Sequence, residues 1–184
     1  MRNMGYFAMH FDAPYAIQMA EEMRESNILC FIGHGTDAGI CFYHDNADYY
    51  SVYSKFVANQ RVLNGYNKEK DASVMGYYQI NELSSVRLVL YIGCYTGKDY
   101  TPAGTTTTYN LVDETYKKGA HCVIGAEGLV TLPRCNEWVK TFFQHARDGW
   151  CIKDCINYAD RLISDSGLKD KLYIMGDVKQ RLDQ

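Results

Sequence analysis

The sequence predicts an α/β fold in which a mostly parallel sheet is layered by helices. Two short apolar runs, 28–32 and 86–92, are each followed by glycine, and continuous runs of this kind are typical of buried parallel strands. Segments with apolar residues at helical spacing alternate with these runs along the chain. This alternation of strands and helices favours a sheet that is covered by helices.

The first half of the chain is expected to contain a helix, a strand and an accessory strand pair. Apolar residues at helical spacing predict the helix over residues 14–25, directly before the strand at 28–32. Two aromatic-rich runs, 39–43 and 49–53, flank a short polar stretch and predict a hairpin or a short strand pair. Residues 61–73 are polar and are expected to form a surface loop.

The second half of the chain is expected to alternate strands with helices more regularly. Gly119 is a natural C-cap for one helix, and Gly149 separates two amphipathic segments. The expected elements are, in order, a strand over 86–92, a helix that starts within 105–108 and ends near Gly119, a strand over 120–126, helices over 136–148 and 152–164, and a last strand over 171–175.

Length and composition favour one globular domain that spans residues 1–184. Hydrophobic residues make up 47% of the chain and charged residues 22%, which is typical of a folded domain. The net charge is −3, and the Lys and Arg residues are scattered, so no basic stripe indicates binding to nucleic acid. We therefore expect no nucleic-acid partner.

The distribution of apolar residues and cysteines predicts a cytoplasmic location. No apolar stretch approaches the roughly 18 residues that a membrane helix needs, and the first residues lack the apolar core of a signal peptide. Seven cysteines occur without the regular spacing of a secreted disulfide scaffold, which fits a reducing compartment. We expect no membrane partner.

Reactive side chains follow both buried strands at the point where each strand ends. His34 lies between two glycines after the first run, and Cys94 follows Gly93 after the second. Because chemistry in open α/β sheets collects beyond the carboxyl ends of the strands, we expect the two side chains to face one crevice. An imidazole can activate a thiol at neutral pH, so the pair predicts a cysteine hydrolase.

These motifs resemble the caspase-like cysteine peptidases of clan CD, and most closely the CHAT and gingipain-like branch. The stretch 87–97, which ends Gly-Cys-Tyr-Thr-Gly, is similar to the branch's cysteine strand, and 119–125 is similar to its Gly-Ala-x-x-Val-Ile-Gly strand. Residues 138–159 resemble the two helices that follow, and 173–177 resemble the closing strand with its Gly-Asp turn. The resemblance covers about residues 28 to 182 and implies a caspase-like fold.

The resemblance implies a role for each residue of the dyad. His34 would be the general base, and Cys94 would be the nucleophile that forms an acyl-enzyme. The backbone N–H groups of Gly35 and Cys94 would form the oxyanion hole. Independently of the family, Gly35 and Gly93 lack a Cβ and so allow a substrate carbonyl to approach the backbone. No metal or other cofactor is expected.

The resemblance implies a protein or peptide substrate. We predict that this substrate has a basic residue before the scissile bond. Several relatives with this preference carry an acid two positions before the cysteine, where this chain has Ile92. Glu127, Asp37 and Asp99 lie in the loops beyond the three strands and are predicted to supply the negative charge instead. Gly93 is expected to contact the substrate as well.

The N-terminal part of the chain departs from the family pattern. Relatives usually have a further strand and helix before the helix that precedes the histidine strand, whereas here only residues 1–27 precede that strand. The family's N-terminal strand and helix are therefore expected to be missing. An upstream segment or an activating partner could complete the domain.

Other interpretations of the same residues stay open. A caspase-like module without catalytic activity, which binds or regulates a partner, is the alternative function, and a hydrolase of non-peptide amides or thioesters is a third. The stretch 93–99 falls one residue short of a phosphate-binding loop and has Asp99 in place of its hydroxyl residue. The stretch 41–48 contains Cys, His and Asp but lacks a second ligand pair at zinc spacing.

Overall fold

The computed structural model describes most of the second half of the chain and parts of the first half. The described residues are 25–43, 49–53, 62–63, 66–67, 72–73, 77–78 and 83–183. The helix expected over 14–25 lies outside these residues, apart from its last position.

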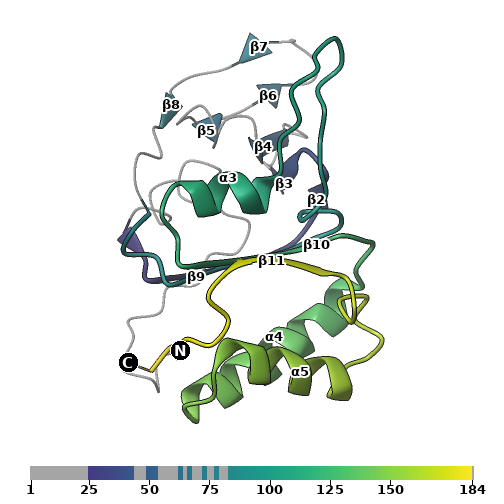
Figure 1. Ribbon diagram of the computed structural model, residues 1–184. Coiled ribbons are helices and arrows are strands. Elements are labelled where there is room, and N and C mark those ends of the chain that lie inside the picture. The colour runs from purple at the N-terminus through teal and green to yellow at the C-terminus, as the bar shows by residue number, and fades with distance from the viewer. Residues whose placement is uncertain are drawn as a thin grey trace.

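A four-stranded, mostly parallel sheet forms the centre of the molecule (Figure 1). Its strand order is β1–β9–β10–β11, where β1 is Ile28–Ile32, β9 is Leu88–Ile92, β10 is Cys122–Ala126 and β11 is Leu172–Gly176. The first three strands run parallel, and β11 pairs with β10 in the antiparallel direction. The prediction of a mixed α/β fold with a mostly parallel sheet is confirmed.

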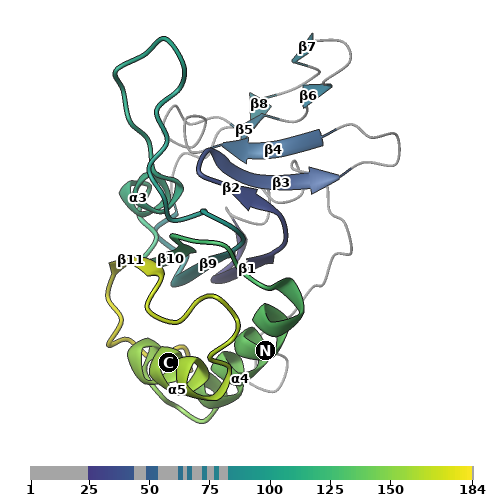
Figure 2. The same ribbon diagram turned by 90° about the vertical axis from the view of Figure 1, so that its right-hand side faces the viewer.

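Three described helices cover the two faces of this sheet (Figures 1 and 2). Helix α3, Leu111–Lys117, connects β9 to β10 and lies on one face. Helices α4, Leu132–Arg147, and α5, Ile152–Leu162, connect β10 to β11 and pack against each other on the opposite face. The sheet is therefore the middle layer of three.

The apolar core is divided in two by the sheet. Alternate side chains of a strand point to opposite faces, so Leu88, Leu90 and Ile92 pack with α4 and α5 while Val89 and Tyr91 pack on the side of α3. All five residues of β9 are buried, as are all five of β10. Burial on both faces explains why these strands are continuous apolar runs in the sequence.

The start of α3 differs from the sequence-based expectation. Asn110, not one of the threonines at 105–108, caps the helix, because its side-chain oxygen accepts a hydrogen bond from the N–H of Val112 (2.9 Å). The threonines belong instead to an exposed arm between β9 and α3, closed by a bridge between Tyr100 and Tyr109. Helix α4 likewise begins earlier than expected, after Thr131, with proline in its first turn.

Accessory strands lie on the same side of the central sheet as α3 (Figure 2). β3, Gly39–Tyr43, and β4, Tyr49–Tyr53, pair in the antiparallel direction, so the predicted strand pair is confirmed. The short strand β2, Gly35–Thr36, joins them to the end of β1. The polar loop expected over 61–73 contains further short strands, namely β5 (Val62–Leu63), β6 (Tyr66–Asn67) and β7 (Ala72–Ser73), followed by β8 (Tyr77–Tyr78).

None of the helices in the described ranges combines the length and the apolar character that are needed to cross a bilayer.

Candidate active site

The candidate site lies where β1 and β9 end side by side. The two strands pair in register from Ile28 with Leu88 to Ile32 with Ile92, and the Gly33 N–H extends the ladder by donating to the Ile92 carbonyl (3.1 Å). His34 and Cys94 each lie two residues beyond the end of this ladder. The two predicted reactive residues therefore come from adjacent turns at one edge of the sheet.

The backbones of these two turns are in close contact, which requires glycine. A Cβ placed on Gly35 would lie 2.9 Å from the Cys94 carbonyl oxygen, and one placed on Gly93 would lie 2.9 Å from the Gly33 carbonyl oxygen. The Gly35 nitrogen would lie 3.2 Å from the same Gly93 Cβ. The amide proposed for the oxyanion hole is thus next to the cysteine turn.

The Cys94 thiol is half-buried and faces the loop between β10 and α4. Its Sγ accepts a hydrogen bond from the Val130 N–H at 3.5 Å. The amide of the next residue, Tyr95, donates to the Gly128 carbonyl of the same loop (3.0 Å). The cysteine turn is thus held against the β10–α4 loop by hydrogen bonds at two successive residues, Cys94 and Tyr95.

Tyr95 has an unusual backbone conformation directly after the cysteine. Its φ of 60° lies in the left-handed region, which costs about 1–2 kcal/mol for a residue other than glycine. Strained residues of this kind are concentrated at functional sites, where the surrounding structure holds them in place. The chain therefore turns sharply after β9, and Cys94 lies in this turn and not in the regular strand.

Thr96 ties the cysteine turn to the sheet. Its side chain is fully buried, and its hydroxyl donates to the Tyr91 carbonyl (2.6 Å) and accepts from the Ala126 N–H (3.0 Å). The Gly97 N–H also binds the Ala126 carbonyl (2.9 Å). The turn is thus fixed both to β9, from which it comes, and to the end of β10.

His34 stands on the exposed side of this arrangement. Its side chain is accessible to solvent, and the residue lies between β1 and β2 on a segment whose neighbours, Gly33 and Gly35, contact the cysteine turn. An exposed imidazole on a backbone that is fixed on both sides can act as a general base.

Three other cysteines of the chain are in environments that suppress the reactivity of their thiols. Burial raises the pKa of the Cys122 and Cys155 thiols to about 12, and burial together with the nearby Cys94 raises the pKa of Cys135 to about 11. Because the thiolate is the reactive form, these three cysteines are expected to be inert at neutral pH. Cys151 is half-buried like Cys94, and its Sγ donates to a carboxylate oxygen of Asp154 (3.3 Å).

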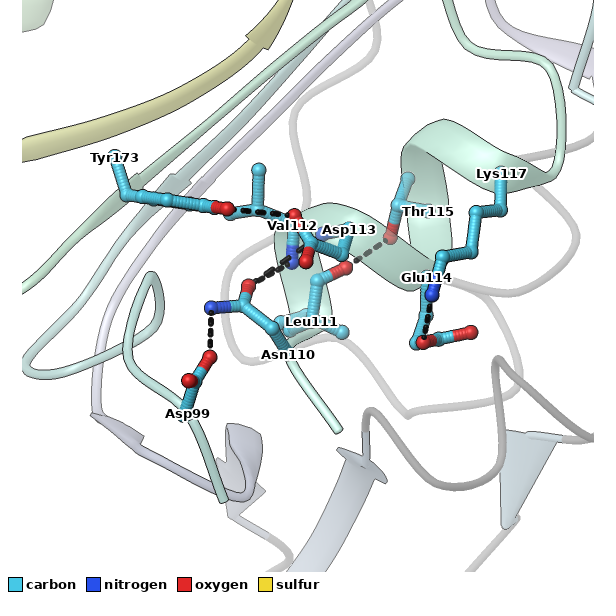
Figure 3. A network of polar contacts seen from close by, with 9 residues as sticks. All are labelled: Asp99, Asn110, Leu111, Val112, Asp113, Glu114, Thr115, Lys117 and Tyr173. Atoms are coloured by element: carbon cyan, nitrogen blue, oxygen red, sulfur yellow. Dashed lines mark hydrogen bonds and ion pairs between the residues drawn. The ribbon is translucent and has the colours of Figure 1, made fainter. Parts of the chain in front are cut away.

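Two of the three predicted acidic residues lie in one cluster beside the site. Asp99 accepts a hydrogen bond from Asn110 (3.1 Å), and Tyr173 on β11 donates to Asp113 (2.9 Å), as Figure 3 shows. The bond to Asp113, burial, and the negative charges of Asp113, Asp99 and Glu127 together raise the pKa of Tyr173. These three carboxylates therefore all act electrostatically on one tyrosine.

The position of this cluster relative to the cysteine follows from the β10–α4 loop. Glu127 is exposed and begins the loop whose later residues, Gly128 and Val130, contact the turn of Cys94. Asp37 lies apart, in the turn between β2 and β3 on the histidine side. Asp99 and Glu127 thus both act electrostatically on Tyr173, whereas Asp37 lies on another part of the chain.

Sequence reasoning missed Asp113, Tyr95 and Val130. A carboxylate in the first turn of a helix that is capped by Asn110 was a usable signal for Asp113, had the start of the helix been placed correctly. The left-handed conformation of Tyr95 and the amide contact of Val130 depend on tertiary packing and have no local signal.

Within the described part of the chain, no group of three or more His, Cys, Asp or Glu residues has a geometry that could hold a metal ion. No family model matches the chain, and no curated protein sequence matches it at a significant level. The functional argument therefore depends on the geometry of the site and on the motifs in the sequence.

Proposed function

We propose that this protein is a cysteine endopeptidase of the caspase-like class, with Cys94 as nucleophile and His34 as general base. The observation that carries the proposal is the contact between the two glycine-flanked turns at the carboxyl ends of the neighbouring strands β1 and β9. The sharp turn at Tyr95 supports it, because strained turns of this kind are concentrated at functional sites.

In the proposed reaction, the substrate carbonyl carbon lies over the Cys94 sulfur. His34 takes the thiol proton as the S–C bond forms, and the Gly35 and Cys94 N–H groups stabilise the resulting oxyanion. His34 then returns this proton to the amide nitrogen as the C–N bond breaks, which releases the amine and leaves a thioester. Water attacks the thioester, releases the carboxylic acid and restores the thiol.

The acidic cluster of Asp99, Asp113 and Glu127 would set the preference for a basic residue before the scissile bond. A lysine or arginine side chain that passes the β10–α4 loop can be paired by these carboxylates. Glu127 is a suitable test position, because it is exposed and is not the residue hydrogen-bonded to Tyr173.

The proposal is tested by cleavage-site profiling of a mixed peptide library under reducing conditions. We expect wild type to generate new termini, and we expect Cys94→Ala and His34→Ala to lose this activity. Cys151→Ala is the matched control, because it removes a half-buried thiol outside the site. Equal cleavage by wild type and Cys94→Ala would contradict the proposal. A basic preference that weakens in Glu127→Gln would support the assignment of the acidic cluster.

The second candidate function is a caspase-like binding module without catalytic activity. The contact of the Cys94 sulfur with the Val130 N–H favours it, since a half-buried thiol held by this loop must turn toward the substrate before it can attack. This function predicts that Cys94 is not alkylated faster than Cys151 by iodoacetamide. The peptidase predicts that Cys94 is alkylated first.

A further inference from the structure

A groove of about 790 Å³ lies on the helix layer, at the end of the sheet opposite the candidate active site. It is formed by the turn between α4 and α5, one side of α5, and the tail that follows β11. Helix α4 begins next to the loop that contacts Cys94 and runs away from it, so the α4–α5 turn is remote from the cysteine. The groove is therefore separate from the proposed peptidase site.

An aromatic cluster lines one part of the groove. The Trp150 ring stacks on the His145 ring at a centroid distance of 4.4 Å, and it meets the edge of the Tyr158 ring at 5.7 Å. Trp150 is 39% exposed, although large aromatic side chains are usually well covered. His145 covers one face of the indole, and the remaining exposed surface can stack against a ligand.

Positive charges line the rest of the groove. Arg161 from α5 and Lys179 and Arg181 from the tail face it, together with the carboxylate of Asp154. A second carboxylate, that of Asp183, lies next to the lining residue Gly149. Among the described residues, no carboxylate forms an ion pair with any of these three cations. The groove is therefore positively charged, although the chain as a whole has a net charge of −3.

The backbone around the groove disfavours a phosphate ligand. Phosphates at a helix N-terminus bind to free N–H groups of the first turn. At the start of α5, however, the Ile152 N–H donates to the Gln180 carbonyl (3.1 Å) and the Lys153 N–H donates to the Val178 carbonyl (2.9 Å). The tail itself thus occupies the first two of these donors, and a negative ligand would bind chiefly to the side-chain cations.

From these features we infer that the groove binds an acidic peptide segment of a partner protein, with an aromatic or other apolar residue between its carboxylates. Carboxylates spaced along a chain fit cations that are spread over α5 and the tail, and the apolar residue fits the exposed surface of Trp150. This inference is independent of the proposed peptidase activity.

The test uses the acetylated and amidated peptide Glu-Glu-Phe-Glu-Glu as a probe. The chain has two tryptophans and Trp138 is fully buried, so a change in tryptophan emission on titration reports chiefly on Trp150. We expect saturable binding by fluorescence and calorimetry, and no binding of Lys-Lys-Phe-Lys-Lys. The double variant Lys179→Glu/Arg181→Glu is expected to weaken binding by roughly tenfold or more.

The matched control is Lys140→Glu/Lys169→Glu, which makes the same charge change at exposed positions outside the groove and is expected to preserve affinity. Absence of binding, or equal affinity of wild type and the Lys179/Arg181 variant, would overturn the inference. Tighter binding of ADP than of the peptide at the same groove would also overturn it, in favour of a nucleotide site. Cys94→Ala is expected to bind the probe like wild type.

Discussion

The two faces of the central sheet are built in different ways. The face under α4 and α5 is covered by large apolar side chains, including the stacked pair Trp138 and Phe142 (5.6 Å). The face under α3 carries one short helix, and buried hydroxyl and amide groups are joined there by hydrogen bonds, such as Tyr91 with Thr115 (2.9 Å). Apolar packing dominates one face, and directional polar contacts shape the other.

Because of this difference, the stability of the fold and the geometry of the site depend mainly on different faces of the sheet. Burial of apolar area is non-directional and tolerates small shifts, whereas hydrogen bonds to Thr96 and Asn110 fix particular atoms of the cysteine turn. We therefore expect substitutions under α4 and α5 to lower stability without altering the folded site. Substitutions on the other face and in the turns should affect the site at a smaller cost in stability.

The largest effect is expected for Trp138→Ala. This side chain is fully buried between the sheet and α5, and its removal leaves a cavity, so the free energy of unfolding should fall by about 3–5 kcal/mol. Urea denaturation followed by circular dichroism measures the change. Trp150→Ala, at the exposed groove, is the control and should cost much less. A similar loss in both variants would show that the core is not concentrated under α4 and α5.

Gly93→Ala should come next. The added methyl group meets the Gly33 carbonyl oxygen at 2.9 Å, and backbone atoms cannot move away as easily as a side chain, so we expect a loss of about 1–3 kcal/mol. Under the proposed function, Gly93→Ala should lower peptidase activity by more than its loss of stability alone explains. In the control Gly128→Ala, the nearest atom is in the flexible Lys171 side chain, at 3.0 Å. Thermal denaturation that ranks Gly128→Ala as the more harmful variant would refute the comparison.

Asn110→Ala should have an intermediate effect. It removes the cap of α3 and the hydrogen bond from the Asn110 side chain to the Gly97 carbonyl (2.9 Å), with an expected cost of about 1–2 kcal/mol. Asn110→Asp keeps the cap acceptor but cannot donate to Gly97. If the cysteine turn depends on that donor, Asn110→Asp should lower activity while retaining most of the stability, as measured by denaturation and by peptide cleavage.

The smallest effect is expected for the pH dependence of stability that arises from Asp160 in α5. Partial burial raises the pKa of Asp160 above the ordinary value of 3.8, against the opposing effect of its hydrogen bond from Trp138. In the interval between 3.8 and the raised pKa, the folded state binds more protons than the unfolded state, so stability falls as the pH rises through this interval. Asp160→Asn should remove this part of the pH dependence in denaturation curves. An unchanged pH profile would contradict the assignment.

Sequence reasoning was most successful where burial is uniform. The strands at 28–32 and 86–92 and the helices α4 and α5 have patterns that reflect apolar burial along their whole length, and these elements occur where expected or within a few residues. The threonines at 105–108 predict the start of α3 too early, because Asn110 is the residue whose side-chain oxygen accepts from the Val112 N–H. The sequence pattern alone does not show that the threonines belong to the arm closed by Tyr100 and Tyr109.

The candidate site was predictable in part. His34 and Cys94 could be placed at neighbouring strand ends because parallel strands share an edge. The pairing direction of β11, the gathering of Asp113 with Asp99 and Glu127, and the contact of Val130 with the sulfur depend on how distant segments pack. No local pattern in the sequence encodes such contacts.

The pairing of β1 with β9 has a consequence for the order of folding. Strands β9, β10 and β11 and the three described helices all lie within one continuous stretch, residues 83–183, whereas β1 is separated from β9 by the whole segment that carries β2 to β8. Closing this long loop costs conformational entropy before β1 gains any contact, so β1 should dock late. Cys94 therefore belongs to the early-folding unit, and His34 arrives with the last strand. Under the proposed function, a nascent chain would acquire its dyad only once folding is nearly complete, and cleavage by partly folded molecules would be limited.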